Sequence, residues 1–362
     1  MGQVRVTVVM LIAAVAIGAP AAGAGSVSAA GPGWAEVSSR TLNIFSPDTS
    51  AIYFVSGYAT GGGVRTVIAG RAPRARYWAI AIYRGTSGAI SSVHDSQIPL
   101  TGGRRYRVVI AGSCRGVQGS CLATGTTSSG LFVYRLYVPV DLSRSGTGGV
   151  GLPLVTYLAR SGQRVSFVRA APGSSVAAEL NALRAGLGKP PPELTRSYPP
   201  PGAVVSPDNS PPPRAHRGSG RGPFANPDNI YLQMHYSLRR GNLVMVAAAP
   251  TYRRQSSHPA NSLDRAGIEQ VRYWSLCIVL RDKVTLDCLR DEQVQMRPGS
   301  DVFDVIVAPR CPVAGYANCL RGGPLPLEDR VTYRNLLVSR AFQASAFAGR
   351  YALRGRYVSR TG

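Results

Sequence analysis

The run Arg76-Tyr77-Trp78-Ala79-Ile80 recurs in the second half of the chain as Arg272-Tyr273-Trp274-Ser275-Leu276. Both runs are rich in aromatic and β-branched residues, which is typical of β-strands. Further matches follow in the same order: Asp95-Ser96-Gln97 with Asp291-Glu292-Gln293, Cys114 and Cys121 with Cys311 and Cys319, and Tyr134-Arg135-Leu136 with Tyr333-Arg334-Asn335. Because the order is kept with few gaps, the sequence predicts two homologous copies of one domain.

Each copy contains several short runs of this kind, separated by Gly, Pro or Ser. No alternation of strand and helix patterns appears, which argues against a parallel α/β fold. About six to eight short strands per copy favour an antiparallel sandwich. The predicted fold is therefore all-β, with two tandem jelly-roll-like β-sandwich domains at residues 40–170 and 227–345.

Residues 171–226 have a different composition. The spacing of apolar residues from Ser174 to Leu187 predicts one short amphipathic helix. Twelve prolines follow between Pro190 and Pro227, which predicts a semi-rigid linker. Residues 346–362 are expected to form a basic tail.

The first 30 residues have the features of a secretory signal peptide. Arg5 precedes an apolar run from Val6 to Ile17, and Ala22-Gly23-Ala24 is a candidate cleavage site, with Val27-Ser28-Ala29 as a second. A retained membrane anchor is the alternative, but the apolar run is short for a span. We therefore expect a protein that is secreted or associated with the cell envelope.

The chain contains six cysteines, an even number that predicts disulfides in an exported protein. Spacing along the chain favours three local pairs. They are Cys114 with Cys121, Cys277 with Cys288, and Cys311 with Cys319. A zinc site is not expected, because the chain has neither CxxC pairs nor clustered histidines.

The formal net charge is +23, and two of the 41 cationic residues are lysines, Lys189 and Lys283. Arginine suits the recognition of phosphate and carboxylate groups, although a GC-rich genome also produces an arginine-rich surface. The arginines are scattered rather than clustered, and this pattern together with export argues against nucleic acid as a partner.

The Trp strand of each copy is predicted to form a hairpin with the Asp strand that follows it. A two-residue turn places Cys277 opposite Cys288 and Trp274 opposite Asp291. One face of each hairpin then carries a polar group: Arg76, Asp95 and Gln97 in the first copy, and Arg272, Asp291 and Gln293 in the second. We expect Arg76 to pair with Asp95 and Arg272 with Asp291. These residues form either a structural ion pair, which their duplication favours, or a polar binding site.

The sequence has no GxSxG, HExxH or Walker pattern. No cofactor or metal is therefore expected. The second copy carries an insertion at 253–270 where His258 is followed by Asp264 and Glu269. These three side chains are candidates for an acid–base pair, and a polar surface loop is the alternative.

The RYWSLC run at Arg272–Cys277, the matching Arg76–Tyr83 strand and the run Gly148–Pro153 resemble a family of uncharacterised secreted actinobacterial proteins. Each half is also similar to a β-sandwich domain of unknown function. Neither resemblance implies an activity. We therefore expect a non-enzymatic exported protein that binds an anionic or carbohydrate component of the cell envelope, such as cell-wall polymer. A secreted hydrolase that uses the 253–270 loop and the domain interface is the alternative, and a scaffold for another exported protein is a third possibility.

Overall fold

The fold was analysed in a computed structural model. It describes residues 33–41, 43, 45–84, 88–144, 146–165, 213, 215–217, 224–252, 269–280, 283–322 and 329–359. Within these ranges, the regular elements are β-strands and single-turn 3-10 helices. The all-β class predicted from the sequence is therefore confirmed.

The first half of the molecule is a sandwich of two sheets. A five-stranded sheet has the order β1-β2-β8-β4-β5, and a four-stranded sheet has the order β7-β6-β3-β9. The strands are β1 (Ala35–Val37), β2 (Ala51–Ala59), β3 (Arg65–Arg71), β4 (Ala75–Tyr83), β5 (Ala89–His94), β6 (Arg105–Ala111), β7 (Ser120–Ala123), β8 (Ser129–Pro139) and β9 (Leu154–Leu158).

The second half repeats this architecture. Its five-stranded sheet has the order β10-β11-β17-β13-β14, and its four-stranded sheet the order β16-β15-β12-β18. The strands are β10 (His216–Arg217), β11 (Asn229–Tyr236), β12 (Asn242–Ala248), β13 (Tyr273–Val279), β14 (Thr285–Arg290), β15 (Val302–Ala308), β16 (Cys319–Arg321), β17 (Asp329–Leu336) and β18 (Arg354–Val358).

The two strand orders correspond position by position, so the topology supports the duplication. Even the exception is repeated, because β6–β7 and β15–β16 are parallel pairs while the other paired strands are antiparallel. The last strand corrects the prediction of a basic tail: β18 pairs with β12 and completes the second sandwich. The tail was mispredicted because its arginines alternate with small and aromatic residues at a sheet edge, where one side meets solvent.

Each sandwich encloses its own apolar core. Trp78 and Trp274 lie at equivalent places in the two cores and are 2% and 0% exposed. Trp78 contacts Tyr106 and Trp274 contacts Phe303, with ring centroids 4.7 Å and 5.2 Å apart. The Trp strand therefore fixes the packing of both halves, as its repetition in the sequence indicates.

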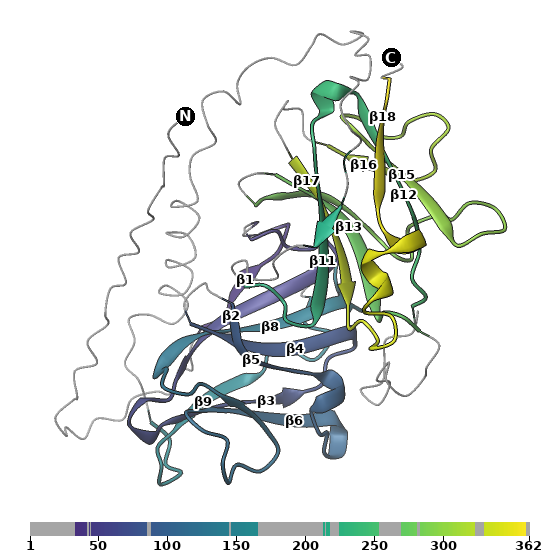
Figure 1. Ribbon diagram of the computed structural model, residues 1–362. Helices are drawn as coiled ribbons and strands as arrows, with labels where there is room; N and C mark the ends of the chain where they lie inside the picture. The colour runs from purple at the N-terminus through teal and green to yellow at the C-terminus, as the bar shows by residue number, and fades with distance from the viewer. Residues whose placement is uncertain are drawn as a thin grey trace, which may run out of the picture.

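The two five-stranded sheets also pack against each other, and the four-stranded sheets lie outside them (Figure 1). Successive side chains of a strand point to opposite faces. In β8, Phe132 and Tyr134 enter the core of the first sandwich, whereas Arg135 and Tyr137 face the second half. Tyr137 meets Tyr273 with ring centroids 5.3 Å apart. The central layers of the molecule therefore enclose a second buried region between the halves.

All three predicted disulfides are present: Cys114–Cys121, Cys277–Cys288 and Cys311–Cys319. The ladder of β13 and β14 places Cys277 opposite Cys288, and Ala81 lies opposite Ser92 in the first copy. The predicted pairing is thus confirmed at these positions in both halves. Nearer the turn each hairpin shifts register, between Ile278 and Val279 and between Ile82 and Tyr83, so the predicted two-residue turns are wrong. Three disulfides fit an extracellular protein.

Several predicted features lie outside the described residues. They are the signal peptide at 1–30, the helix between Ser174 and Leu187, and nearly all of the proline-rich linker. Within the part of the chain that the structure covers, we find no helix of the length and apolarity that crossing a membrane requires.

Candidate functional site

The buried arginines of the two hairpins form ion pairs with the opposite copy. Arg76 Nη1 lies 2.7 Å and 2.6 Å from the two carboxylate oxygens of Asp291, and Arg272 Nη1 lies 2.5 Å from Asp95 Oδ1. The predicted pairs, Arg76 with Asp95 and Arg272 with Asp291, are therefore wrong. The register argument treated each sandwich alone, whereas the packed halves bring the carboxylate of the other copy within reach.

The two glutamines do not complete this network either. Gln97 Oε1 accepts a hydrogen bond from the His94 backbone N–H, and Gln293 Oε1 accepts the equivalent bond from Arg290, each at 3.0 Å. Both glutamine side chains are exposed. Each one closes the tight turn that begins at Asp95 or Asp291, so its role is local and structural.

The surroundings of Arg76 also indicate a structural role. Its side chain is 1% exposed and that of Asp291 is 0% exposed. The guanidinium carbon lies 5.6 Å from the ring centroids of both Tyr252 and Tyr273. Burial raises the pKa of Asp291, and the charge of Arg76 and its hydrogen bonds oppose that rise. The crossed pairs thus join the two halves and leave little room for a ligand.

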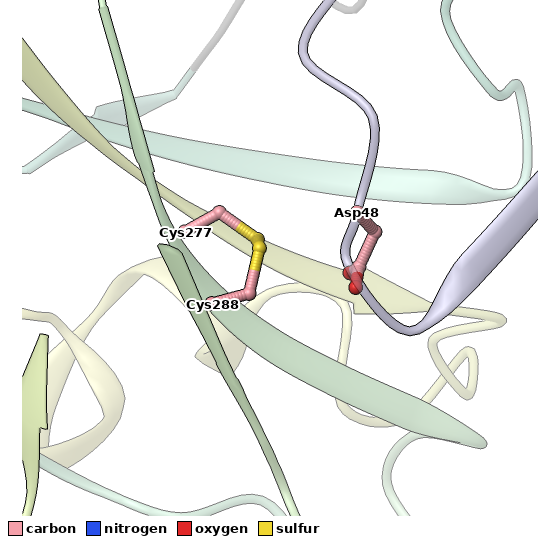
Figure 2. A group of neighbouring side chains, drawn as sticks. All are labelled: Asp48, Cys277 and Cys288. Carbon is pink, nitrogen blue, oxygen red and sulfur yellow. A yellow bond between two sulfur atoms is a disulfide. The ribbon is translucent and has the colours of Figure 1, made fainter. Parts of the chain in front are cut away.

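Asp48 and the Cys277–Cys288 disulfide form the group that most resembles a metal site among the described residues (Figure 2). Its two sulfur atoms are bonded to each other, so they are not the thiolates that metals bind. The Asp48 carboxylate accepts hydrogen bonds from Ser275 Oγ at 2.5 Å and Tyr273 Oη at 3.0 Å. These residues therefore do not form a metal centre.

A cavity of about 240 Å³ lies between the two five-stranded sheets. Both halves contribute to its wall, with residues from β1, β2, β8, β11 and β17 and from the segments around 46 and 225. The lining residues are Val37, Phe45, Ser46, Pro47, Tyr53, Val55, Val133, Arg135, Tyr137, Phe224, Ala225, Asn226, Tyr231, Gln233, Lys283, Arg330, Thr332 and Arg334. Four of them are cationic and none is acidic.

Arg135 and Arg334 occupy equivalent positions in the two copies. The ladders place Arg135 opposite Tyr53 and Arg334 opposite Tyr231. Arg135 is 0% exposed and Arg334 is 3% exposed. Buried charges of this kind are normally paired with an opposite charge. Their positions in the centres of two long strands therefore require an explanation.

The hydrogen-bond partners of Arg135 are few. One Nη atom donates to Tyr83 Oη and to the Phe224 carbonyl. Its Nε and its other Nη atom have no partner within the described part of the chain, and no carboxylate there lies within ion-pair distance. Buried donors without partners are rare in folded proteins. Arg135 thus brings a buried positive charge, without a carboxylate partner in the described chain, to the lining of the cavity.

Arg334 has a partial counterion, because its Nη1 lies 3.8 Å from Asp48 Oδ2. Arg330 donates to Ser46 Oγ at 3.0 Å, and its Nε has no partner among the residues described. Burial lowers the pKa of Arg330, and the neighbouring charge of Arg334 lowers it further. The two guanidinium groups therefore repel each other across a half-buried space.

Lys283 adds a fourth positive charge. Burial lowers the pKa of its ammonium group, and repulsion from Arg330 lowers it further. Its backbone carbonyl accepts a hydrogen bond of 2.7 Å from the Ser46 N–H, which ties this turn to the first half. An anion in the cavity would relieve the repulsion among Lys283, Arg330 and Arg334.

Sequence reasoning did not identify these cavity residues. The available signal was a charged residue inside a run of apolar ones, Arg135 within Leu131–Val138, and its recurrence as Arg334 in the second copy. Buried strands seldom contain charge unless it has a partner or a ligand. The repeated arginine indicates the duplication, but the sequence of one copy does not show that the outer face carrying it is buried by the other copy.

The 253–270 insertion cannot be placed near the cavity. His258 and Asp264 lie outside the described residues, and Glu269, which is described, is half-buried beside the backbone bridge between Tyr252 and Val271. The acid–base pair proposed from this loop stays a prediction.

Comparisons with known proteins support the fold but indicate no activity or ligand. No protein-family model matches the chain, and curated proteins give no match. An uncharacterized protein from Burkholderia cenocepacia is similar in structure, with a TM-score of 0.57 and 13% identity over 91% of this chain and 82% of that chain. A Vibrio parahaemolyticus protein gives a TM-score of 0.45 and 10% identity over 86% and 90%. The first likeness shows that the whole two-sandwich arrangement occurs elsewhere.

Proposed function

We propose that the protein is an exported, non-enzymatic binding protein that holds an anionic ligand in the cavity between its two sandwiches. The observation that carries this proposal is the arginine-lined wall, where Arg135, Arg330 and Lys283 have no carboxylate partner among the described residues. A buried positive charge without a counterion is costly, and an anion would neutralise it. The acceptor oxygens of phosphate or carboxylate match guanidinium donors.

Three disulfides and the apolar N-terminal run support an extracytoplasmic location. The ligand is therefore expected to be an anionic or carbohydrate-linked component of the cell envelope, or its breakdown product. In this proposal the site is a partly open pocket between the two sheets and not a flat sheet face, so it suits a small anion or the end of an anionic chain.

The presence of only two lysines allows a direct test. Reductive methylation with ¹³C-formaldehyde retains the positive charge of Lys283 and gives it an NMR signal. Titration with inorganic phosphate is expected to shift that signal in a saturable way, and Lys283→Arg assigns it by removing it. A Lys283 signal that does not move while the protein stays folded would refute the proposal.

Two arginine variants distinguish the cavity from general surface charge. Arg330→Gln is expected to abolish the phosphate-dependent shift while leaving the melting temperature equal or higher, because it removes repulsion with Arg334. Arg297→Gln is the matched control, since Arg297 is 51% exposed and pairs with Asp304 away from the cavity. Equal loss of the shift in both variants would indicate non-specific screening instead of a site.

A further inference from the structure

We propose that the ligand of this cavity is amphiphilic, with a doubly charged anionic group such as a phosphomonoester at one end and a ring-sized apolar group at the other. This inference rests on the proposed anion-binding function and specifies its ligand class. It follows from a difference between the two walls of the cavity.

Equivalent positions of the two copies face each other across the cavity, and the strand ladders identify them. Val55 lies opposite Val133 in the first copy, and Gln233 lies opposite Thr332 in the second. The Tyr–Arg pair two residues away is the same in both copies. At the neighbouring position, however, one copy has two valines and the other has two hydrogen-bonding side chains. Beside the shared Tyr–Arg pair, the duplicated cavity wall is therefore apolar on one side and polar on the other.

The difference in polarity between the two copies continues two residues further along β8 and β17. Leu131 of β8 corresponds to Arg330 of β17, because these residues lie opposite Gly57 and His235 in equivalent ladders. Thr332 Oγ1 is buried and has no hydrogen-bond partner in the described chain. The second copy thus supplies a charged and a hydroxyl side chain at places where the first supplies aliphatic side chains.

Aromatic residues extend the apolar wall. Phe45 and Phe224 line the cavity with ring centroids 5.0 Å apart, and Phe224 also contacts Tyr83 at 5.2 Å. Val55 and Val133 pack in the same apolar cluster. These four side chains would remove an apolar group from water and offer no hydrogen bonds to a polar one. A fully hydrated inorganic anion would leave this part of the cavity without a complementary surface.

The opposite wall indicates the charge of the anionic end. Arg330, Arg334 and Lys283 gather there, and Asp48 partly balances Arg334 alone. A dianionic phosphomonoester neutralises more of this charge than a carboxylate does, and its oxygens can accept from more than one guanidinium. The volume of about 240 Å³ lies below the ~300–1,000 Å³ of typical ligand pockets, so a single ring with its phosphate is the size that fits.

Phenyl phosphate, inorganic phosphate and phenol are the probes that test this inference, with affinities measured by calorimetry or by the Lys283 signal. Phenyl phosphate is expected to bind tighter than inorganic phosphate by roughly 10- to 100-fold, as burial of one ring implies. Equal affinities for the two phosphates would overturn the amphiphilic ligand and leave anion binding intact. Absence of binding by both phosphates, or phenol binding as tightly as phenyl phosphate, would overturn the proposed function as well.

Two reciprocal variants examine the walls themselves. Val133→Thr places the residue of the second copy in the apolar wall and is expected to lower the ratio of phenyl phosphate to phosphate affinity several-fold. Thr332→Val makes the reverse change and is expected to raise it. Val140→Thr is the matched control, because Val140 is 57% exposed and lies outside the cavity lining. A ratio that is the same in Val133→Thr and Val140→Thr would overturn the inference.

Discussion

Replacing Asp291 with Asn is expected to destabilise the protein by less than the ~3–5 kcal/mol that a wholly unpaired buried ion costs, because Arg76 Nη2 keeps its contact with the partly exposed Glu292. The substitution removes the charge that faces Arg76 at 2.6 Å, in a pair whose side chains are 1% and 0% exposed. Arg76→Gln should cost a similar amount, because it leaves Asp291 buried and charged. The double variant should cost less than the two single variants together.

The size of that difference follows from the geometry. Two charges ~4 Å apart interact by about 4 kcal/mol at an effective dielectric constant near 20, and the loss of hydration of both groups opposes this attraction. We therefore expect a coupling energy of roughly 1–3 kcal/mol between Arg76 and Asp291. Arg297 and Asp304 form the control pair, since their side chains are 51% and 27% exposed; their coupling should be below ~1 kcal/mol.

Guanidinium unfolding followed by tryptophan fluorescence measures these energies, because Trp34 and Trp78 pack in the first sandwich and Trp274 in the second. The wild-type chain should unfold in one transition, since each half supplies buried contacts to the other. A coupling for Arg76–Asp291 equal to that of the exposed pair would refute the argument. Stronger coupling of Arg76 with Asp95 than with Asp291 would show that the ion pairs form within each copy.

Three further predictions concern other features. Anion affinity should fall as the pH rises through the lowered pKa of Lys283. The attraction is complete while the ammonium is protonated and is lost above that pKa. In a calorimetric titration, Lys283→Arg should remove this pH dependence. Ala81→Cys with Ser92→Cys should form an additional disulfide at the register of the second-copy one, and persistent free thiols in the oxidised protein would contradict this. In chemical unfolding, Gly130→Ala should destabilise the protein by about 1–3 kcal/mol, because its Cβ would lie 2.5 Å from a β4 carbonyl oxygen. The control Gly88→Ala should be near neutral, because its Cβ would meet no atom within 4 Å.

Sequence analysis correctly predicted features that depend only on strands adjacent along the chain within one copy. The pairing of Cys277 with Cys288 was predicted correctly, although the register shift nearer the turn was not, and the aromatic runs identify the core of each sandwich. The duplication was also visible, because residues that define a fold recur in the same order. These features need only local geometry and a periodicity of two.

The sequence could not specify how the halves meet. Hydrophobic periodicity separates the core face of a strand from its outer face, but Arg135 and Arg334 lie on outer faces that are nevertheless buried. The partners of Arg76 and Arg272 depend on this same packing. The cavity exists because two sandwiches face each other, so no pattern within one copy predicts it.

The crossed ion pairs are reciprocal: each copy contributes one arginine and one aspartate, and each receives the other's. This is the isologous contact by which identical subunits form a two-fold symmetric dimer. A site on the axis of such a dimer must be symmetric, because every substitution appears on both walls at once. When both halves belong to one chain, a substitution changes one wall alone. Covalent fusion thus permits an axial cavity with one mainly apolar and one mainly cationic wall, which a symmetric pair of identical chains cannot have.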